Sequence, residues 1–174
     1  MFSLLDLADA KQNIYADRPE AVYSPNNSEV SFDLAQMTTT DRGNAIEYMV
    51  AKRMRLAGID AEHIGGTNSF DIKIFVNGKI VRAEVKSSLL GPQSGKYYFQ
   101  KLKPGEFDIV FFAFVHPTDG VIVKSCGIRT IRQWIAEYNP TANENGYNVY
   151  FNASMINKKL PTITWNPTGQ GVEV

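Results

Sequence analysis

The stretch "NSFDIKIFVNGKIVRAEVKSS", residues 68–88, has the pattern of a β-hairpin. Two runs of alternating apolar and polar residues flank Asn77-Gly78, a dipeptide that strongly favours a two-residue type I′ turn. Such a turn sets the register of the strands that it joins. The predicted cross-strand pairs are Val76 with Lys79, Ile74 with Val81, Ile72 with Ala83, and Asp71 with Glu84.

The predicted register divides the hairpin into an apolar face and a charged face. The apolar face, which we expect in the core, consists of Phe70, Ile72, Ile74, Val76, Val81, Ala83 and Val85. The charged face consists of Asp71, Lys73, Arg82, Glu84 and Lys86. Charges of this kind often pair loosely on a solvent-exposed face, and on the hairpin alone that interpretation stays open.

Asp71 and Glu84 are the unusual pair on the charged face, because two carboxylates directly opposite each other repel. A divalent cation between them would turn that repulsion into attraction. Carboxylate oxygens, with the remaining positions left to water and phosphate, suit magnesium. Lys86 follows two residues after Glu84 on the same face, where its ammonium could approach a water or a phosphate. The hairpin is therefore a candidate active centre.

An amphipathic helix is predicted upstream, over "TTTDRGNAIEYMVAKRMRLAG", residues 38–58. We expect about four turns. Thr40 or Asp41 can cap the N-terminus, and Gly58 suits the left-handed position that ends the helix.

Glu47 falls on the inward-facing stripe of this helix, in line with Val50 and Met54. A buried carboxylate is costly unless it has a partner. A metal or water site shared with Asp71 and Glu84 would supply that partner. The alternative is an arginine at the rim of the core.

The rest of the chain predicts more strands and helices around this centre. Strands are expected at residues 96–102, 107–115, 121–125, 147–152 and 161–165, and helices at residues 4–11 and 130–138. The segment 107–115 is apolar throughout and so belongs in the middle of a sheet. The predicted fold class is α/β, of the α+β type, with a mixed sheet flanked by helices in one domain spanning residues 1–174.

Composition excludes several classes of protein. One cysteine among 174 residues leaves no internal disulfide and no thiolate zinc cluster. No run of 18 apolar residues is present, so we expect no membrane span. Asp6 and Asp9 stand where a signal peptide would be basic, so we expect an intracellular, cytoplasmic protein. Because the net charge is zero, contact with nucleic acid needs a local basic patch.

The order of these residues resembles the PD-(D/E)xK nuclease superfamily, which has a restriction-endonuclease-like core. A helix glutamate is followed by a glycine-containing loop, an aspartate, a hairpin and Glu-x-Lys. Residues of about 40 to 115 look most like the branch with archaeal Holliday-junction resolvases and small phage or intron-encoded endonucleases. Phe70 replaces the proline before the aspartate. The resemblance implies a core of about residues 38–125, with residues 1–37 and 126–174 as elaborations.

The resemblance also implies roles for particular residues. It implies a catalytic set of Glu47, Asp71, Glu84 and Lys86. It implies metal ligation by Asp71, Glu84, the carbonyl of Val85 and Glu47, with Mg²⁺ as the cofactor and Mn²⁺ as a substitute. Lys86 would orient or activate the attacking water, while Ser87 and Ser88 would contact phosphate.

Residues 96–103 interleave lysines with aromatic residues, a pattern that could track phosphates and stack on bases. The candidate DNA-binding residues here are Lys96, Tyr98, Gln100, Lys101 and Lys103. The alternative is that the aromatic rings face inward and the lysines are merely solvated. His63 and His116 are expected at the surface or in turns, and Cys126 as a small buried residue.

The sequence thus predicts a magnesium-dependent DNA endonuclease, resolvase-like or specific for a duplex site. The alternative is a non-catalytic nuclease-fold protein that binds DNA or serves as an assembly protein. One set of catalytic residues cuts one strand, so paired cuts predict a homodimer or a higher even oligomer. The expected partner is duplex or branched DNA, without a membrane.

Overall fold

The computed structural model describes residues 33–66, 68–118, 120–138, 142–143 and 146–152. The helices are α3 (Thr39–Leu56) and α4 (Ile128–Tyr138). The strands are β1 (Ala61–His63), β2 (Ile72–Val76), β3 (Lys79–Leu89), β4 (Lys96–Leu102), β5 (Ile109–His116), β6 (Gly120–Gly127), β7 (Ala142–Asn143) and β8 (Gly146–Asn152). The helix and the strand expected at residues 4–11 and 161–165 lie outside the described residues.

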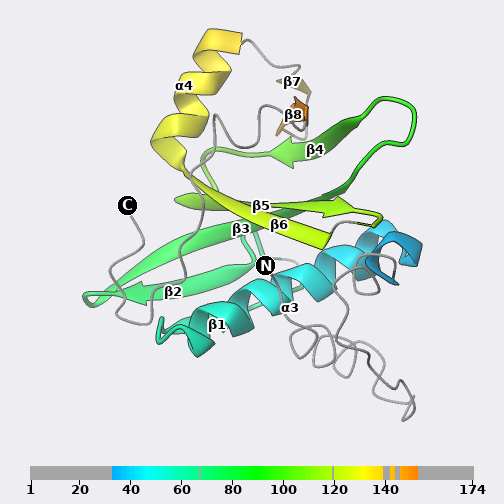
Figure 1. The fold of residues 1–174 in the computed structure, drawn as a ribbon. Helices are drawn as coiled ribbons and strands as arrows, with labels where there is room; N and C mark the ends of the chain where they lie inside the picture. The colour runs from blue at the N-terminus through cyan, green and yellow to red at the C-terminus, as the bar shows by residue number, and fades with distance from the viewer. Residues whose placement is uncertain (1–32, 67, 119, 139–141, 144–145, 153–174) are drawn as a thin grey trace, which may run out of the picture.

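The strands form two sheets that lie one above the other (Figure 1). The larger sheet has the order β1-β2-β3-β5-β6, and the smaller has the order β4-β8-β7. In the larger sheet β3 pairs with β5 in parallel, while the other neighbours are antiparallel. The predicted mixed α/β architecture is confirmed, whereas the second sheet was not predicted. In the described part of the chain, no helix is long and apolar enough to cross a membrane.

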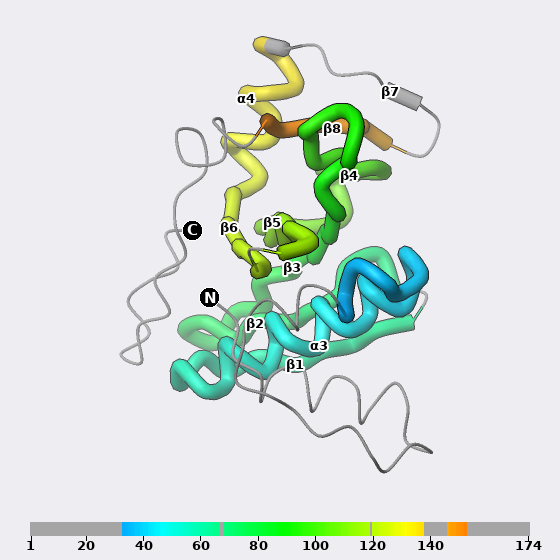
Figure 2. The backbone as a smooth tube through the Cα atoms, turned by 45° about the vertical axis from the view of Figure 1, so that its right-hand side comes forward, coloured from blue at the N-terminus to red at the C-terminus, as the bar shows by residue number. Residues whose placement is uncertain are grey.

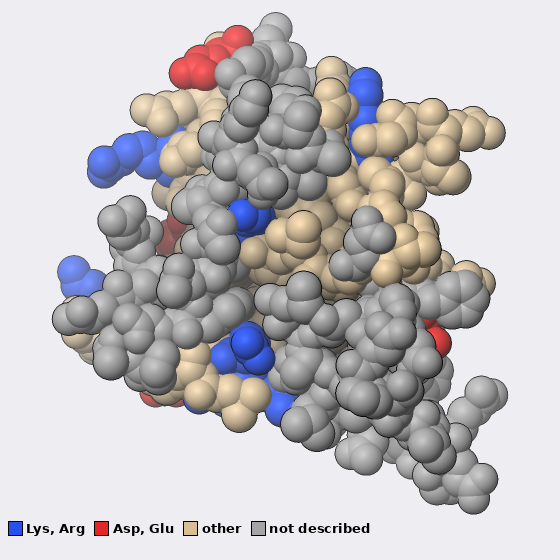
Figure 3. Space-filling model, in the orientation of Figure 1, with Lys and Arg blue, Asp and Glu red and all other residues tan. Residues whose placement is uncertain are grey.

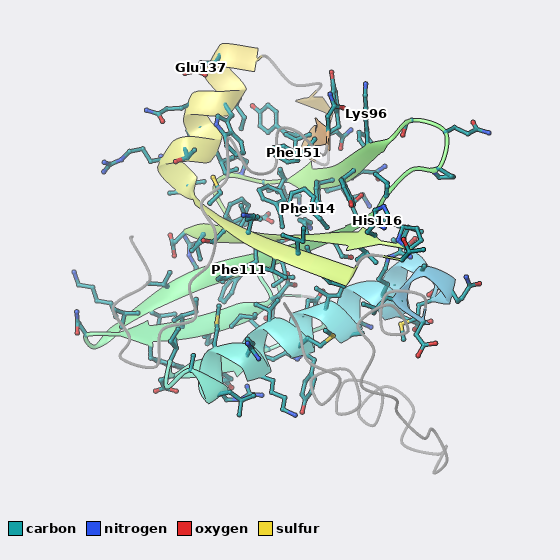
Figure 4. The ribbon with its side chains drawn as sticks, viewed as in Figure 1. Lys96, Phe111, Phe114, His116, Glu137 and Phe151 are labelled. Atoms are coloured by element: carbon teal, nitrogen blue, oxygen red, sulfur yellow. The ribbon has the colours of Figure 1, made fainter. Side chains whose placement is uncertain are left out.

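Strand β5 divides the core, as expected for a central strand that is buried along nearly all its length. Phe111 points toward α3, and Phe114 points toward Phe151 of the smaller sheet (Figure 4). The larger sheet therefore has one face covered by α3 and the other covered by α4 and the smaller sheet (Figure 2). Two apolar clusters result, one on each face.

The hairpin of β2 and β3 has the predicted register. Ile72 lies opposite Ala83, Ile74 opposite Val81, and Val76 opposite Lys79. Both turn residues have positive φ, 49° at Asn77 and 75° at Gly78, as a type I′ turn requires.

Phe70 is an exception to the predicted faces of the hairpin. Ile72, Ile74 and Ala83 are buried against α3, but Phe70 packs into the cluster on the opposite face of the sheet. The reason is that β2 begins only at Ile72. Strict alternation of side chains holds within a strand, and residues 69–71 form a bend before it.

The charged face of the hairpin is not uniformly exposed, in contrast to the expected solvent-exposed face. Glu84 is buried, with 9% of its surface exposed. Near the turn the same face carries the exposed apolar pair Phe75 and Ile80.

Helix α3 lies within the predicted range of residues 38–58, but it has more turns than expected and an earlier N-cap. Its 18 residues make five turns, and its N-cap is Thr38 rather than Thr40 or Asp41. The Thr38 hydroxyl accepts a hydrogen bond from the Asp41 backbone N–H at 3.1 Å. Gly58 follows the helix with φ 79°, the left-handed conformation that the sequence predicted.

Candidate active site

The candidate site lies where the pairing of β2 with β3 ends. Asp71 immediately precedes β2, and its backbone N–H donates to the Ala83 carbonyl at 2.9 Å. One residue pair further, the Val85 N–H donates to the Asp71 carboxylate oxygen Oδ2 at 2.7 Å. The Asp71 side chain, just before the first residue of β2, thus accepts a backbone N–H of β3. This bond fixes the Asp71 carboxylate beside the middle of β3.

The Val85 carbonyl faces the same side as the Asp71 carboxylate. In a β-strand the N–H and C=O of one residue point in the same direction. Since the Val85 N–H is directed at Asp71, the Val85 carbonyl is directed toward that side as well. A carboxylate oxygen and a backbone carbonyl oxygen are both ligands that magnesium accepts.

Glu84 and Lys86 project from β3 on the face of the larger sheet that packs against α4 and the smaller sheet. The Lys86 ammonium contacts the Glu84 carboxylate oxygen Oε1 as an ion pair. Their side chains are 25% and 11% exposed, for Lys86 and Glu84 respectively, so the pair is largely withdrawn from solvent. Burial raises the pKa of Glu84, and the charge of Glu47 raises it further, while Lys86 opposes both effects.

Glu47 reaches the same region from α3, and its partner is a residue that the sequence did not indicate. His63 Nε2 lies 3.2 Å from Glu47 Oε2, where the two side chains are 25% and 16% exposed. An ionised carboxylate only accepts hydrogen bonds, so the Nε2–H donates to it. The expectation of an isolated surface or turn histidine is wrong for His63, which ends strand β1. Among the described residues, the partner of Glu47 is this histidine and not the arginine that was the alternative.

The environment of His63 holds its ring in place. The ring of Tyr48 meets it edge-on, with 6.4 Å between centroids. Gly65 has φ 50°, and a side-chain carbon at this position would lie 3.4 Å from His63 Cε1. His63 is thus placed by a strand of three residues. The sequence "AEHIGG" has no pattern that predicts this strand or its contact with Glu47. The nearby tyrosine and glycines are the one signal that could have suggested a packed ring.

The three carboxylates influence one another, as a shared site requires. The pKa of Asp71 is raised to about 7, first by burial and then by the charges of Glu84 and Glu47. The bond from Val85 and the charge of Lys86 lower it only in part. We call Glu47, Asp71 and Glu84 the carboxylate cluster.

The carboxylate cluster fits magnesium better than a metal held by a closed cage of side chains. Among the described residues, no three His, Cys, Asp or Glu side chains are grouped tightly enough to hold an ion. Magnesium commonly uses one or two carboxylates together with waters and substrate phosphate. Asp71 and Glu84, with the Val85 carbonyl, supply oxygen atoms of this kind. Burial is the first cause that raises the pKa of both carboxyl groups, and the charge of Glu47 adds to it.

The predicted phosphate-binding serines are placed differently from each other. Ser88 is buried, and its hydroxyl accepts the Tyr98 backbone N–H at 2.7 Å, which joins β4 to β3. Ser87 is partly buried, and its position in β3 places it on the opposite face of the sheet. The Ser88 hydroxyl is thus engaged within the sheet, while the contact of Ser87 with phosphate stays a prediction.

The candidate DNA-binding residues of β4 and the loop after it are exposed. These are Lys96, Tyr98, Gln100, Lys101 and Lys103, while Tyr97 and Phe99 between them are buried. The alternative prediction therefore holds for two of the aromatic residues and not for Tyr98. On the face drawn in Figure 3, the blue Lys and Arg side chains stand in separate groups.

The remaining reactive side chains lie away from the carboxylate cluster. His116 ends β5, and its Nδ1 lies 3.3 Å from the Thr118 backbone N–H, which donates to it. Cys126 is buried, and burial raises the pKa of its thiol to about 12, so it stays protonated at neutral pH. The prediction of Cys126 as a small buried residue is confirmed.

Removing the donor on His63 is expected to weaken metal binding at the site. In His63→Leu the Glu47 carboxylate loses the bond that orients it, and outer hydrogen bonds of this kind contribute about 10- to 100-fold to metal affinity or activity. Titration with Mn²⁺, followed by calorimetry, would measure the change. His63→Gln keeps an N–H donor and should recover much of the affinity. Equal loss in both variants would show that His63 only supports packing.

Solved structures that are similar to this chain include a homing endonuclease and a Holliday junction resolvase. The bacterial homing endonuclease I-Ssp6803I is similar with a TM-score of 0.48 and 14% identity, over 66% of this chain and 78% of its own. Hjc, a Holliday junction resolvase from Archaeoglobus fulgidus, is similar with a TM-score of 0.43 and 13% identity, over 70% of this chain and 92% of its own. No family model and no curated protein matches.

Proposed function

We propose that this protein is a magnesium-dependent DNA endonuclease that hydrolyses phosphodiester bonds. The observation that carries the proposal is the approach of Glu47 and Glu84 to the buried Asp71, where burial first, and then the charges of Glu84 and Glu47, raise the pKa of Asp71 to about 7. A protein gains no stability from bringing three carboxylates together, whereas a cation site requires it. The Lys86 ammonium at the edge of this cluster supplies the group that phosphoryl chemistry also needs.

The proposed metal ligands are the carboxylates of Asp71 and Glu84 and the carbonyl of Val85. Glu47 would act through a water molecule or as a further ligand, held by His63. Magnesium, when bound, neutralises the negative charge that develops on the phosphate during attack by water. Mn²⁺ is expected to substitute, because it accepts the same oxygen ligands.

In this proposal Lys86 has different partners in the absence and in the presence of the metal. Without metal it neutralises Glu84. When a cation takes over that carboxylate, the ammonium can donate hydrogen bonds to the attacking water or to the phosphate. The water then adds to phosphorus as the bond to the leaving oxygen breaks. The proton of the water passes to a basic group or to solvent.

A non-catalytic role remains the second candidate, and one observation favours it. Lys86 pairs with Glu84, and His63 pairs with Glu47, so two of the three carboxylates already have partners within the chain. A nuclease-fold protein that only binds DNA could keep such a charge network for structure. Asp71 is harder to explain as part of a structural charge network. Its carboxylate accepts a hydrogen bond from the Val85 backbone N–H, and its pKa is raised despite that bond.

A cleavage panel separates the two candidates. The substrates are a four-way junction, a plasmid, a linear duplex and a single strand, each with Mg²⁺ and with excess chelator. We expect metal-dependent cutting of at least one substrate and none in chelator. Binding of all substrates without any cutting in Mg²⁺ or Mn²⁺ would support the non-catalytic candidate instead.

The same panel tests the proposed assembly. One carboxylate cluster per chain cuts one strand, and two-fold symmetry is the simplest way to cut both strands in one binding event. We therefore propose a homodimer or a higher even oligomer on DNA. Plasmid should be linearised without accumulating nicked circles, and sedimentation with DNA at micromolar protein should give an even stoichiometry. A monomer that only nicks would remove paired cutting and leave the chemistry intact.

A further inference from the structure

The smaller sheet has an outer face that differs in character from its inner face. Tyr97, Phe99 and Phe151 point inward and pack against β5. Figure 4 shows Phe151 between the two sheets and Lys96 on the outer side. On that outer side Tyr98 of β4 lies directly opposite Tyr150 of β8. The two rings are 48% and 57% exposed, so each leaves about half of its surface open to a ligand.

The charge of this outer face is positive. Strands β4 and β8 contain Lys96 and Lys101 and no acidic residue, in a chain whose net charge is zero. The Lys96 ammonium lies 4.8 Å from the centre of the Tyr150 ring. A cation beside an aromatic ring is held there and stays available to an anion in solution. The face thus combines open aromatic rings with a charge that complements phosphate.

A bulge in β4 gives Lys101 its position on this sheet. Phe99 pairs with Val149 and Leu102 pairs with Tyr147, so two residues of β4 face Asn148 alone. The Asn148 side-chain oxygen Oδ1 accepts the Lys101 backbone N–H at 3.2 Å.

Lys101 itself is in a strained conformation. Its φ is 59°, the left-handed region, where a bulge normally has glycine. A lysine there is strained in a way that glycine would not be, and such strain is typically kept for function. The exposed Lys101 side chain is the feature that a glycine would lose.

The outer face is connected to the carboxylate cluster. The Tyr98 backbone N–H donates to the hydroxyl of Ser88, at 2.7 Å. Ser88 follows two residues after Lys86 on the same face of β3. The strand that carries Tyr98 is therefore hydrogen-bonded to the strand that carries Glu84 and Lys86.

We propose that this outer face binds unpaired nucleotides of a DNA substrate, and we call it the stacking platform. It consists of Lys96, Tyr98, Lys101, Asn148 and Tyr150. The tyrosine rings stack on bases, and the lysines contact phosphates. Bases within a duplex have both faces covered by their neighbours, so a flat aromatic surface selects nucleotides that are not paired. The inference rests on the proposed function in taking DNA as the ligand, and it narrows the substrate to DNA with an unpaired segment.

Fluorescence anisotropy in excess EDTA tests the stacking platform without any cleavage. The probes are a labelled oligothymidylate of about 12 nucleotides, within the range that one binding module covers, and a duplex of equal length. Tyr98→Ala and Tyr150→Ala should each weaken single-strand binding about 5- to 150-fold, the range for loss of one stacked base, and leave duplex binding unchanged. Tyr98→Phe should keep the wild-type affinity. Phe75→Ala, which removes an exposed ring at the hairpin, is the matched control and should change nothing.

Lys101→Gly gives a second readout with two opposite effects. It should raise the melting temperature, because glycine relieves the strain at φ 59°, and it should lower the affinity for oligothymidylate. The dependence of that affinity on salt should also become shallower, by the loss of one phosphate contact. A purely structural role for the bulge predicts the rise in melting temperature alone.

The possible outcomes separate this inference from the proposed nuclease activity. Unchanged oligothymidylate binding in Tyr98→Ala and Tyr150→Ala would overturn the stacking platform even if the protein cuts DNA. Tighter binding of oligouridylate RNA than of oligothymidylate, or an equal loss of duplex binding, would overturn its assignment to unpaired DNA. Loss of single-strand binding in the tyrosine variants of a protein that cuts nothing would support the platform and refute the nuclease.

Discussion

Asp71→Asn is expected to abolish metal-dependent cleavage and, at pH 8 without metal, to make the protein more stable. The loss of cleavage should be at least about 10³-fold, because charge neutralisation by a metal is worth several kcal/mol and each 1.4 kcal/mol is about tenfold in rate. The gain in stability has a separate origin. Burial and two neighbouring carboxylates disfavour the charged form of Asp71, and asparagine carries no charge to disfavour.

The sign of the pH dependence follows from the raised pKa of Asp71. The folded protein holds the proton up to about pH 7, whereas the unfolded chain releases it near pH 3.8. The protonated carboxyl therefore stabilises the fold fully below about pH 4, and this stability is lost as the pH rises to about 7. With about 1.4 kcal/mol per pKa unit, Asp71→Asn should gain up to about 4 kcal/mol at pH 8 and almost nothing at pH 4.

Urea unfolding of the metal-free protein at pH 4, 6 and 8 measures this difference. Asp108→Asn is the matched control, since Arg82 binds Asp108 and lowers its pKa. That variant should lose stability at neutral pH, and the loss should vanish as the pH falls through the range of a carboxyl group. Addition of Mg²⁺ should stabilise the wild type at pH 8 and leave Asp71→Asn unchanged. Equal stability of Asp71→Asn and wild type at every pH would show that the carboxylate cluster is not under electrostatic stress.

Lys86→Ala is expected to lower cleavage by about 10²- to 10⁴-fold, the range for a group that assists proton transfer or orients the attacking water. Binding of DNA should change little, because the ammonium is largely withdrawn from solvent and paired with Glu84. The metal-free variant should also lose about 1–3 kcal/mol of stability, since the buried Glu84 carboxylate is left without its cation.

A double-mutant cycle with Glu84→Gln separates the two effects of Lys86→Ala. In the Glu84→Gln background the ion pair is already absent, so Lys86→Ala should cost little further stability. Lys86→Arg should keep the pair and the stability while recovering only part of the activity, because the guanidinium places its donors differently. Wild-type cleavage by Lys86→Ala, or cleavage in excess chelator, would argue for another mechanism.

The elements that the sequence determined by itself depend on short-range chemistry. Asn77-Gly78 adopts positive φ at both residues and so sets the register of β2 and β3 across the whole hairpin. Gly58 ends α3 for a similar reason, and the apolar run of β5 places that strand in the middle of the sheet. The composition of the candidate site follows from these elements, because register and helical spacing bring Glu47, Asp71 and Glu84 to one region.

The partners of these residues were decided by the tertiary structure. Glu47 binds His63, 16 residues away, only because the three-residue strand β1 pairs with β2. The stacking platform joins Lys101 to Asn148, 47 residues apart, through a sheet that the local pattern did not reveal. Phe70 changes faces because a bend precedes β2, and Ser88 is buried where β4 of the smaller sheet bonds to β3. Periodicity tells which face of a strand is apolar, but the side chain that meets a given group depends on contacts between distant segments, which periodicity does not encode.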